Sequence, residues 1–357
     1  MRRAACTLLA CLLLGLLPPA AVAKRSVPQG WLGVIADGPM THEGASVDRE
    51  WDLMASSGVE GVRTAFYWPN VQREEGVPPD FARFDAVVLS AARRGLPVLP
   101  IVTGTPGWAG ERRGDETSPP RDPGLYADYL RALVARYGPR GTLWAEHPEV
   151  TARPIRAWQI WNEPNLTRYW SRQPFARSYV KLLEAAHGAL AAADPGARVV
   201  LAGLPNESWT ALRKVYKAGG KRYFDAVALH PYTGKPRDVV RLAELARKEM
   251  RRFRDARKPI WITELSWPAA KGKTRNTTGF ETTDKGQAGK LRDGIRLLAR
   301  ARKRLRIQRV FWYTWLSEEG SPNSFDYSGL RRVRGGNVVS APALDAFRDA
   351  ARRLTSR

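Results

Sequence analysis

The sequence predicts a single α/β domain, a (β/α)8 TIM barrel, on the basis of three observations. Short apolar, β-branched or aromatic runs recur eight times, amphipathic helical patterns lie between them, and several of the runs are hydrophobic nearly throughout. Strands that are buried on both faces have this continuous apolar character. Eight strand–helix units in a chain of 357 residues indicate parallel strands that are joined by right-handed crossovers and closed into a barrel.

The predicted strands are spaced so that a helix fits after each of them. They cover residues 31–36, 61–68, 96–102, 155–161, 198–204, 224–230, 259–265 and 307–315. The clearest helical patterns are at 84–95, 126–138 and 175–194, and Gly95 and Gly138 are candidate C-caps. An open, doubly wound sheet is the competing architecture. No G-x-G-x-x-G or P-loop pattern joins a strand to a helix, so the barrel is favoured.

The first 23 residues have the pattern of a secretory signal peptide. Arg2 and Arg3 precede an apolar run at 6–17, and the small-residue pattern Ala-Val-Ala follows at 21–23. We therefore expect a secreted, extracellular protein whose barrel spans residues 24–357. A membrane anchor, for which the run is short, and a lipoprotein signal at Cys11 are the alternatives. Both cysteines of the chain lie in this segment, which leaves no thiol chemistry for the mature protein.

The net charge of +23 is high, and its basic residues cluster on predicted helices at 246–258, 298–309 and 347–357. On amphipathic helices, such residues form solvated outer faces. No zinc-finger, helix-turn-helix or RNA-binding motif accompanies them, so we expect no nucleic-acid partner. An anionic polysaccharide or the cell surface is the other partner that this charge allows. The four histidines show no metal-ligand spacing, and we expect neither a metal nor another cofactor, and no membrane span.

The stretch "WQIWNEPNL" at 158–166 places a carboxylate at the end of a buried strand. Pro164 stops the strand directly after Asn162 and Glu163. A second carboxylate, Glu264 in "WITELSWP", follows the seventh strand. Because the carboxyl ends of barrel strands meet at one mouth, both should face a single cleft. Two carboxylates on either side of a sugar are the groups that glycosidic cleavage requires. The competing interpretation of Glu163 is a helix N-cap.

Two further polar groups come from neighbouring strands. Arg63 lies on the second strand, and His230-Pro231-Tyr232 follows the sixth. An arginine beside Glu264 favours its ionised form, and the proximity of two carboxylates raises the pKa of the other, Glu163. The sequence therefore predicts that Glu163 is a general acid and that Glu264 is ionised.

This ordered set of motifs resembles the clan A glycoside hydrolases of the family 39 and family 5 type. The resemblance covers about residues 31–330. Besides "WNEPN" and "WITELSWP", it is carried by "RTAFYWPNVQREEG" at 63–76, "GLPVLPIVTGTPGWA" at 95–109, "ADPGARVVLAGL" at 193–204, "FDAVALHPY" at 224–232 and "DKGQAGKL" at 284–291.

The resemblance implies a barrel and a retaining double displacement, with Glu163 as acid/base and Glu264 as nucleophile. It implies that Asn162 binds the 2-hydroxyl of the sugar being cleaved, and that Arg63 supports the nucleophile. His230 and Tyr232 would border the site. The family likeness also places Trp315 under the sugar, and Trp68 and Trp108 are candidate walls of further subsites.

The function expected from these features is hydrolysis of O-glycosidic bonds in oligo- or polysaccharides, of the β-xylosidase, β-glucosidase or endo-glucanase type. A non-catalytic carbohydrate-binding barrel and a transglycosidase are the alternatives. A further one is a hydrolase of an anionic polysaccharide, which would place Arg112, Arg113, Arg168 or Lys271 along the cleft. The polar loop at 271–286 is expected to cover the site.

Overall fold

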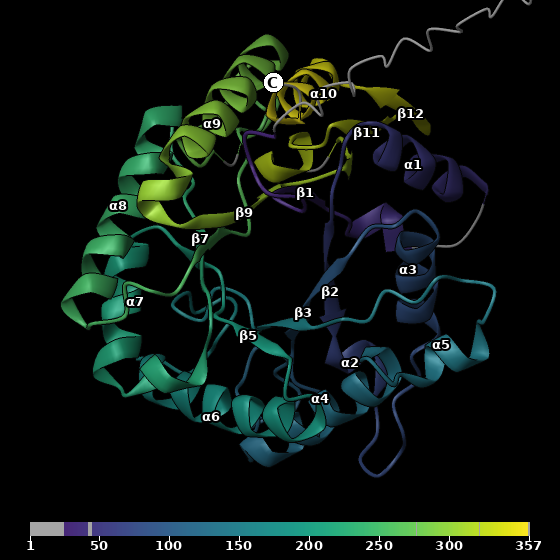
Figure 1. The fold of residues 1–357 in the computed structure, drawn as a ribbon, viewed down its shortest axis with the longest axis vertical. Coiled ribbons are helices and arrows are strands. Elements are labelled where there is room, and N and C mark those ends of the chain that lie inside the picture. The colour runs from purple at the N-terminus through teal and green to yellow at the C-terminus, as the bar shows by residue number, and fades with distance from the viewer. Residues whose placement is uncertain (1–24, 42–44, 276, 321, 356–357) are drawn as a thin grey trace, which may run out of the picture.

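The computed structural model describes residues 25–41, 45–275, 277–320 and 322–355. The predicted signal peptide lies outside these residues. Nine strands form one parallel sheet that curls around a central axis, and helices surround it (Figure 1). The strands are β1 (Leu32–Ile35), β2 (Val62–Tyr67), β3 (Val98–Thr103), β4 (Ala157–Ile160), β5 (Arg198–Val200), β6 (Leu204–Pro205), β7 (Val227–His230), β8 (Ile260–Ile262) and β9 (Ile307–Trp312).

The sheet closes on itself, which confirms the predicted α/β barrel. The strand order is β5-β4-β3-β2-β1-β9-β8-β7-β6. A parallel bridge joins Val200 to Ala226, and the N–H of Leu201 donates to the carbonyl oxygen of Ala226 at 3.0 Å, so that the two ends of the order meet. The predicted strand at 198–204 is wrong in one respect, because it is divided into β5 and β6.

A steric constraint applies at the break in the fifth strand. A Cβ at Gly203 would lie 1.8 Å from Nε2 of His230, which is much closer than any real contact. Glycine is therefore required where the backbone passes under this imidazole. The break between β5 and β6 therefore lies at the point where the backbone contacts His230.

Eight longer helices form the outer ring (Figure 1). They are α1 (Ala45–Ser56), α3 (Ala82–Arg93), α4 (Pro123–Tyr137), α6 (Ala176–Ala193), α7 (Ser208–Lys217), α8 (Pro236–Arg252), α9 (Asp284–Leu305) and α10 (Pro342–Thr355). Two of these helices begin with a polar cap: Asp122 accepts from the N–H of Gly124 before α4, and Thr283 accepts from that of Gly286 before α9. Among the described residues, no helix is both long and apolar enough to cross a membrane.

Shorter elements fill the connections. They are α2 (Trp68–Val71), α5 (Thr142–Glu146) and the 3-10 helices η1 (Gly38–Thr41), η2 (Gly220–Tyr223) and η3 (Ser324–Tyr327). A small sheet that the sequence analysis did not predict lies between β9 and α10, made of β10 (Leu316–Glu318), β11 (Arg331–Arg334) and β12 (Asn337–Ser340). Gly335 and Gly336 have φ of 54° and 79° and turn the chain between its last two strands.

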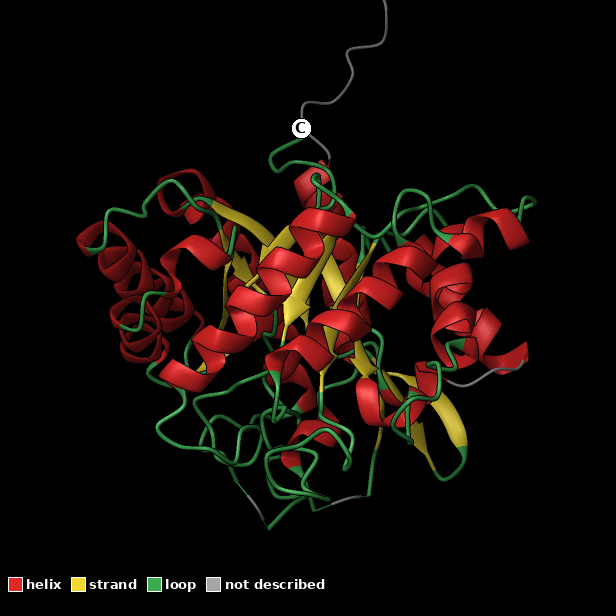
Figure 2. Cartoon of the chain, turned by 90° about the horizontal axis from the view of Figure 1, so that it is seen from below, coloured by secondary structure: helices red, strands yellow, loops and turns green. Residues whose placement is uncertain are grey.

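The core positions the site by filling the barrel beneath it. A compact group of side chains occupies the barrel interior, and a larger apolar cluster packs the sheet against the helices. Figure 2 shows the barrel from the side, with long loops gathered at one end of the strands. Three long segments follow strand ends, at 104–122 after β3, 161–175 after β4 and 263–283 after β8. The interior group consists of Ile35, Leu99, Val200, Ala226, Ala228, Trp261 and Phe311.

Candidate active site

A cleft of about 380 Å³ opens at the carboxyl ends of the strands. The prediction that polar residues from separate strands converge there is supported by its lining. The residues that line it just after a strand are Asp37 (β1), Asn162 and Glu163 (β4), Asn206 (β6), Tyr232 (β7), Glu264 (β8) and Tyr313 (β9).

An unusual backbone turn points Glu163 into this cleft. Trp161 and Glu163 both have positive φ, 70° and 46°, in the left-handed region that bulky side chains seldom adopt. Such conformations cost about 1–3 kcal/mol each and persist where the surroundings fix them. Here the N–H of Trp161 donates to Val102 and that of Glu163 donates to Gly203, at 2.9 and 3.1 Å. No described helix begins at Glu163, since α6 starts at Ala176, so the helix-cap interpretation is wrong.

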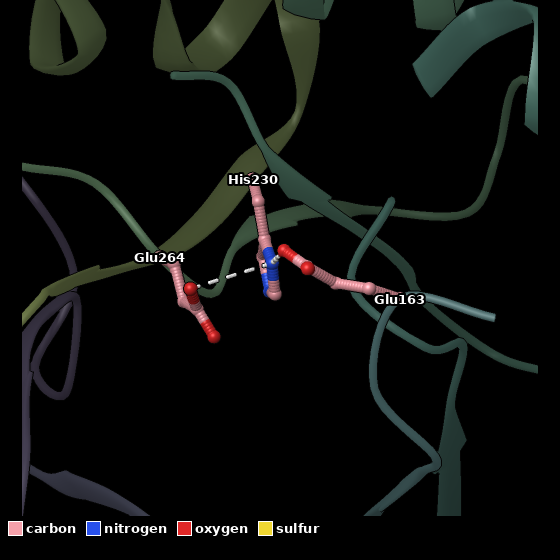
Figure 3. Close-up of side chains that lie close together, drawn as sticks. All are labelled: Glu163, His230 and Glu264. Atoms are coloured by element: carbon pink, nitrogen blue, oxygen red, sulfur yellow. Dashed lines mark hydrogen bonds and ion pairs between the residues drawn. The ribbon is translucent and has the colours of Figure 1, made fainter. Parts of the chain in front are cut away.

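His230 lies between the two glutamates (Figure 3). Its Nδ1 is 2.6 Å from Oε1 of Glu163 and 3.5 Å from Oε2 of Glu264. The imidazole has no exposed surface, and its Nε2 faces Gly203 without a hydrogen-bond partner among the described residues. The hydrogen-bond network therefore assigns the proton to Nδ1, which donates to Glu163.

Glu264 is held from two sides. Arg63 donates from Nη1 to Oε1 at 2.8 Å, and the hydroxyl of Tyr232 donates to Oε2 at 2.6 Å. The fully buried Arg63 also donates to Asn162 at 3.0 Å and to Gln159 at 2.7 Å. One guanidinium thus fixes the carboxylate of Glu264 and the amide that precedes Glu163.

These surroundings shift the pKa values of the two glutamates in opposite directions. Burial raises the pKa of Glu163, and this exceeds the opposing effect of the hydrogen bond from His230. Burial also acts on Glu264, but the electrostatic influence of His230 and Arg63, with the hydrogen bonds from Tyr232 and Arg63, holds its pKa below the usual value. Glu163 is therefore the group suited to carry a proton and Glu264 the group suited to stay ionised.

Glu163, His230 and Glu264 are also the kind of donor set that divalent metals use, and one ligand atom from each lies within 4.8 Å of the other two. Two features of the site oppose this use. Both oxygens of Glu264 already accept strong hydrogen bonds, and the guanidinium of Arg63 would repel a cation. The arrangement suits proton transfer better than metal ligation.

The three predicted tryptophan platforms do not line the cleft. Trp315 and Trp68 have no exposed surface, so neither can stack on a sugar. Trp315 donates to Oε2 of Glu50 at 3.1 Å, and Trp68 stacks on Tyr129 at 5.1 Å. Trp108 is half-buried and packs edge-on against Trp68 at 5.7 Å. The predicted sugar-stacking roles of Trp315 and Trp68 are therefore wrong, whereas that of Trp108 in a further subsite stays a prediction.

Aromatic residues that the sequence analysis missed form the apolar wall of the cleft. Phe311 and Tyr313 lie two residues apart, so both side chains face the barrel interior. Tyr313 directly follows β9 and is the aromatic residue that this part of the chain places at the cleft. Tyr232 stacks on Phe280 at 5.5 Å and meets Phe325 edge-on at 5.0 Å. Phe280 belongs to the predicted covering loop at 271–286, which does border the cleft. Tyr169, from the segment after β4, completes the wall.

Asp37 is a third carboxyl group in the cleft, half-buried, and it was also missed. Its Oδ1 accepts from the N–H of Ala65 at 2.8 Å and from the hydroxyl of Thr64 at 3.0 Å. Burial raises its pKa, although those hydrogen bonds and the charge of Arg63 oppose the shift. The signal was present in the sequence, because Asp37 directly follows the first strand "WLGVIA".

Of the four basic residues expected along the cleft, the structure places one there. Arg168 borders it and lies 4.7 Å from the ring centroid of Tyr169. Arg112, Arg113 and Lys271 are exposed and are not among the lining residues.

Comparisons with known proteins give structural likeness only. No family model and no curated protein matches the sequence. A family 39 glycoside hydrolase from the gut symbiont Bacteroides cellulosilyticus WH2 superposes with a TM-score of 0.65 at 19% identity, over 91% of this chain and 64% of that one. This chain therefore spans less than two thirds of that protein.

Two other solved structures are similar to the same degree. A monomeric β-xylosidase from Caulobacter crescentus CB15 has a TM-score of 0.64 at 19% identity, over 91% of this chain and 69% of that one. The GH5_18 protein from Streptomyces cattleya, in complex with GlcNAc, has a TM-score of 0.68 at 19% identity, over 93% and 81%. These are the two families that the sequence motifs resemble, and this chain has the barrel fold that they share.

Proposed function

We propose that this protein is a secreted, retaining β-glycoside hydrolase. The observation that carries the proposal is the asymmetry of the glutamate pair. Glu264 is ion-paired with Arg63 and hydrogen-bonded by Tyr232, whereas Glu163 is buried and faces His230 alone. The two groups lie at the mouth of a barrel whose solved structural neighbours include glycoside hydrolases of families 39 and 5.

In the first step of the proposed reaction, Glu264 attacks the anomeric carbon and Glu163 gives its proton to the leaving oxygen. A covalent glycosyl–enzyme forms as the glycosidic bond breaks. In the second step, Glu163 takes a proton from water, which attacks the same carbon and releases Glu264. Asn162, held by Arg63, is placed to hydrogen-bond the sugar hydroxyl next to that carbon.

The distance between the carboxylates supports retention of configuration. An oxygen of Glu163 and one of Glu264 lie within 4.8 Å of each other. Retaining glycosidases place their carboxyl groups about 5–5.5 Å apart, and inverting enzymes leave about 6.5–9.5 Å for a water molecule. The narrow gap favours direct attack by Glu264.

The charge of the cleft favours a neutral sugar at the cleavage point. Asp37 and the two glutamates line it, and Arg168 is the basic residue of its lining. A uronic acid would bring a fourth carboxylate close to Asp37, in surroundings where like charges repel strongly. If the substrate is an anionic polysaccharide, its charged sugar units must therefore bind farther from the cleavage point, near Arg168. Secretion rests on the signal-peptide pattern of residues 1–23.

The test is hydrolysis of aryl β-xylosides, β-glucosides, β-mannosides and β-N-acetylglucosaminides by the wild type, Glu163→Ala and Glu264→Ala. We expect azide to rescue Glu163→Ala with formation of a β-glycosyl azide and Glu264→Ala with formation of the α-product. Wild-type product mixtures with added acceptor sugars then separate a hydrolase from a transglycosidase.

Two outcomes would contradict the proposal. Activity that survives both substitutions would place the reaction elsewhere in the molecule. Binding of sugars without turnover of any substrate by the wild type would instead identify a carbohydrate-binding barrel.

A further inference from the structure

A second pocket, of about 430 Å³, lies at the opposite mouth of the barrel. Its lining includes Val98, Ala157 and Arg198, which are the first residues of β3, β4 and β5. The candidate active site is lined by residues that follow strands, whereas these residues begin them. The amino-terminal face of such barrels is normally a place for stabilising contacts and does not carry the reaction.

All the charged residues that line this pocket are basic. Arg156, Arg198 and Arg309 line it, and its lining contains neither Asp nor Glu. The side chain of Arg198 makes no hydrogen bond or ion pair within the described part of the chain, and Arg309 donates only to the carbonyl of Gly30, at 3.1 Å. Arg156 reaches Asp194, but at the long distance of 3.5 Å. Most of the guanidinium donors in this pocket are therefore unused.

Arg309 is held in place by packing. Its guanidinium lies 4.9 Å from the ring centroid of Trp261 in a cation–π arrangement, and both residues line the pocket. Burial and the charge of Arg198 lower the pKa of Arg309. Two like charges share a partly desolvated space, which is unfavourable unless a negative group offsets them.

The strand positions of these arginines are themselves unusual. Arg309 and Phe311 lie two residues apart on β9, as Arg198 and Val200 do on β5, and both apolar partners face the barrel interior. The arginines thus occupy the lowest interior layer, where barrels normally place branched apolar side chains. Departures of this kind from local packing rules are typical of functional positions.

We propose that this pocket is a binding site for a tetrahedral oxyanion, a phosphate or sulfate group, either free or carried on a sugar. Arginine presents parallel N–H donors that match two oxygens of such a group. Three guanidiniums around one space supply enough donors to surround it. The inference is independent of the proposed glycosidase, since no residue of this pocket lines the active-site cleft.

The experiment measures binding of inorganic phosphate, inorganic sulfate and glucose 6-phosphate to the full chain by calorimetry, and the midpoint of thermal unfolding with each. Sodium chloride at equal ionic strength and neutral glucose are the controls. We expect saturable binding and a higher midpoint than chloride gives. Tight binding of the free ions identifies a site for the ion itself, whereas binding of glucose 6-phosphate alone identifies a phosphorylated sugar as the ligand.

Variants connect the binding to these arginines. Arg198→Gln and Arg309→Gln should each weaken binding about tenfold, which corresponds to the loss of one charge-assisted hydrogen bond. Arg309→Lys keeps the charge but loses the planar guanidinium, and should be intermediate. Arg177→Gln, which removes an exposed charge from α6, should leave the affinity unchanged. Without oxyanions, Arg198→Gln should raise the unfolding midpoint, because it removes the repulsion.

The proposal is overturned if no probe binds, or if Arg177→Gln weakens binding as much as Arg198→Gln does. It is equally overturned if phosphate and chloride shift the midpoint alike at equal ionic strength. Because Arg198 is exposed at a strand start, its variant is expected to fold even if Arg309→Gln does not.

Discussion

At the residue scale, the site depends on a few buried polar groups that satisfy one another. Arg63 donates to Gln159 on β4, to Asn162 after it and to Glu264 after β8, and each of them would lose this hydrogen bond without it. His230 connects to both glutamates through one nitrogen. Buried networks of this kind hold their members in a single geometry, and the loss of one member affects all the others.

Removal of the arginine gives the first prediction. Arg63→Met should abolish most activity and lower the free energy of unfolding by about 3–5 kcal/mol, because Glu264 is left as an unpaired buried charge. Chemical denaturation measures the loss. The double variant Arg63→Met/Glu264→Gln should recover much of the stability, since the charge is then absent. No recovery would mean that packing, and not charge, accounts for the effect.

Asp37 gives the second prediction. If its carboxyl group binds a sugar hydroxyl, Asp37→Ala should lower kcat/KM by about one to two orders of magnitude, as expected for a hydrogen bond to a charged group. Asp37→Asn keeps an acceptor for the N–H of Ala65 and should lose less. Steady-state kinetics on the aryl glycoside that the wild type hydrolyses fastest measure these changes in kcat/KM. Equal kcat/KM for the wild type and Asp37→Ala would show that Asp37 does not touch the substrate.

At the element scale, strand ends and breaks determine which side chains reach the cleft. Between β5 and β6, the backbone of Gly203 passes close to the imidazole of His230. On the basic helix α8, neighbouring elements likewise determine whether a side chain is buried or exposed. Arg247, predicted on a solvated face, is 2% exposed and donates to the carbonyl oxygens of Ala256, Lys258 and Leu305. A long basic side chain can thus serve as a buried connector between elements.

The third prediction concerns the break in the fifth strand. Gly203→Ala should displace His230, lower the free energy of unfolding by about 1–3 kcal/mol and reduce activity, because the added methyl group has no space. Gly188→Ala is the matched control, as nothing lies within 4 Å of its added Cβ on α6. That change should be neutral or stabilising by about 0.5–1 kcal/mol. Thermal unfolding and initial rates of both variants test the difference. A fully active Gly203→Ala would show that the break does not position His230.

At the scale of the whole molecule, the two mouths of the barrel differ in charge. Three carboxyl groups line the candidate active site, and three guanidiniums line the pocket at the other mouth. The net charge of +23 therefore does not describe the surroundings of the proposed reaction. Local groups set those surroundings, because buried charges interact strongly and are screened little, whereas distant surface charges are screened by salt.

The fourth prediction is the pH dependence of the whole enzyme. The rate constant kcat/KM should fall in acid as Glu264 is protonated, below the usual glutamate value of 4.5, and in base as Glu163 loses its proton, above that value. Initial rates across pH test this bell shape. Glu264→Gln should abolish activity at every pH, and a profile without an alkaline limb would contradict the role of Glu163.

The same shifts affect stability in opposite directions. The lowered pKa of Glu264 stabilises the fold above the unfolded-state pKa, and this contribution disappears as pH falls through the folded value. The raised pKa of Glu163 contributes stability below the unfolded-state pKa, which is lost as pH rises through the folded value. Unfolding of Glu163→Gln and Glu264→Gln across pH separates the two contributions.

The sequence by itself determined the barrel, its strand order and the candidate pair Glu163 and Glu264. Hydrophobic periodicity reports which segments are buried strands, and in a closed parallel barrel every strand ends at the same mouth. The ordered motifs are therefore sufficient to predict that these two residues lie at the same mouth of the barrel.

Only the tertiary structure decided which other groups face the cleft. Tyr313 takes the place expected for Trp315, because β9 ends at Trp312 and the chain beyond it turns Trp315 away from the cleft toward Glu50. Asp37 and the wall around Phe280 depend on how distant loops fold together, as does the arginine pocket at the other mouth. Periodicity describes each segment separately, whereas burial and charge at strand ends depend on neighbours far away in the sequence.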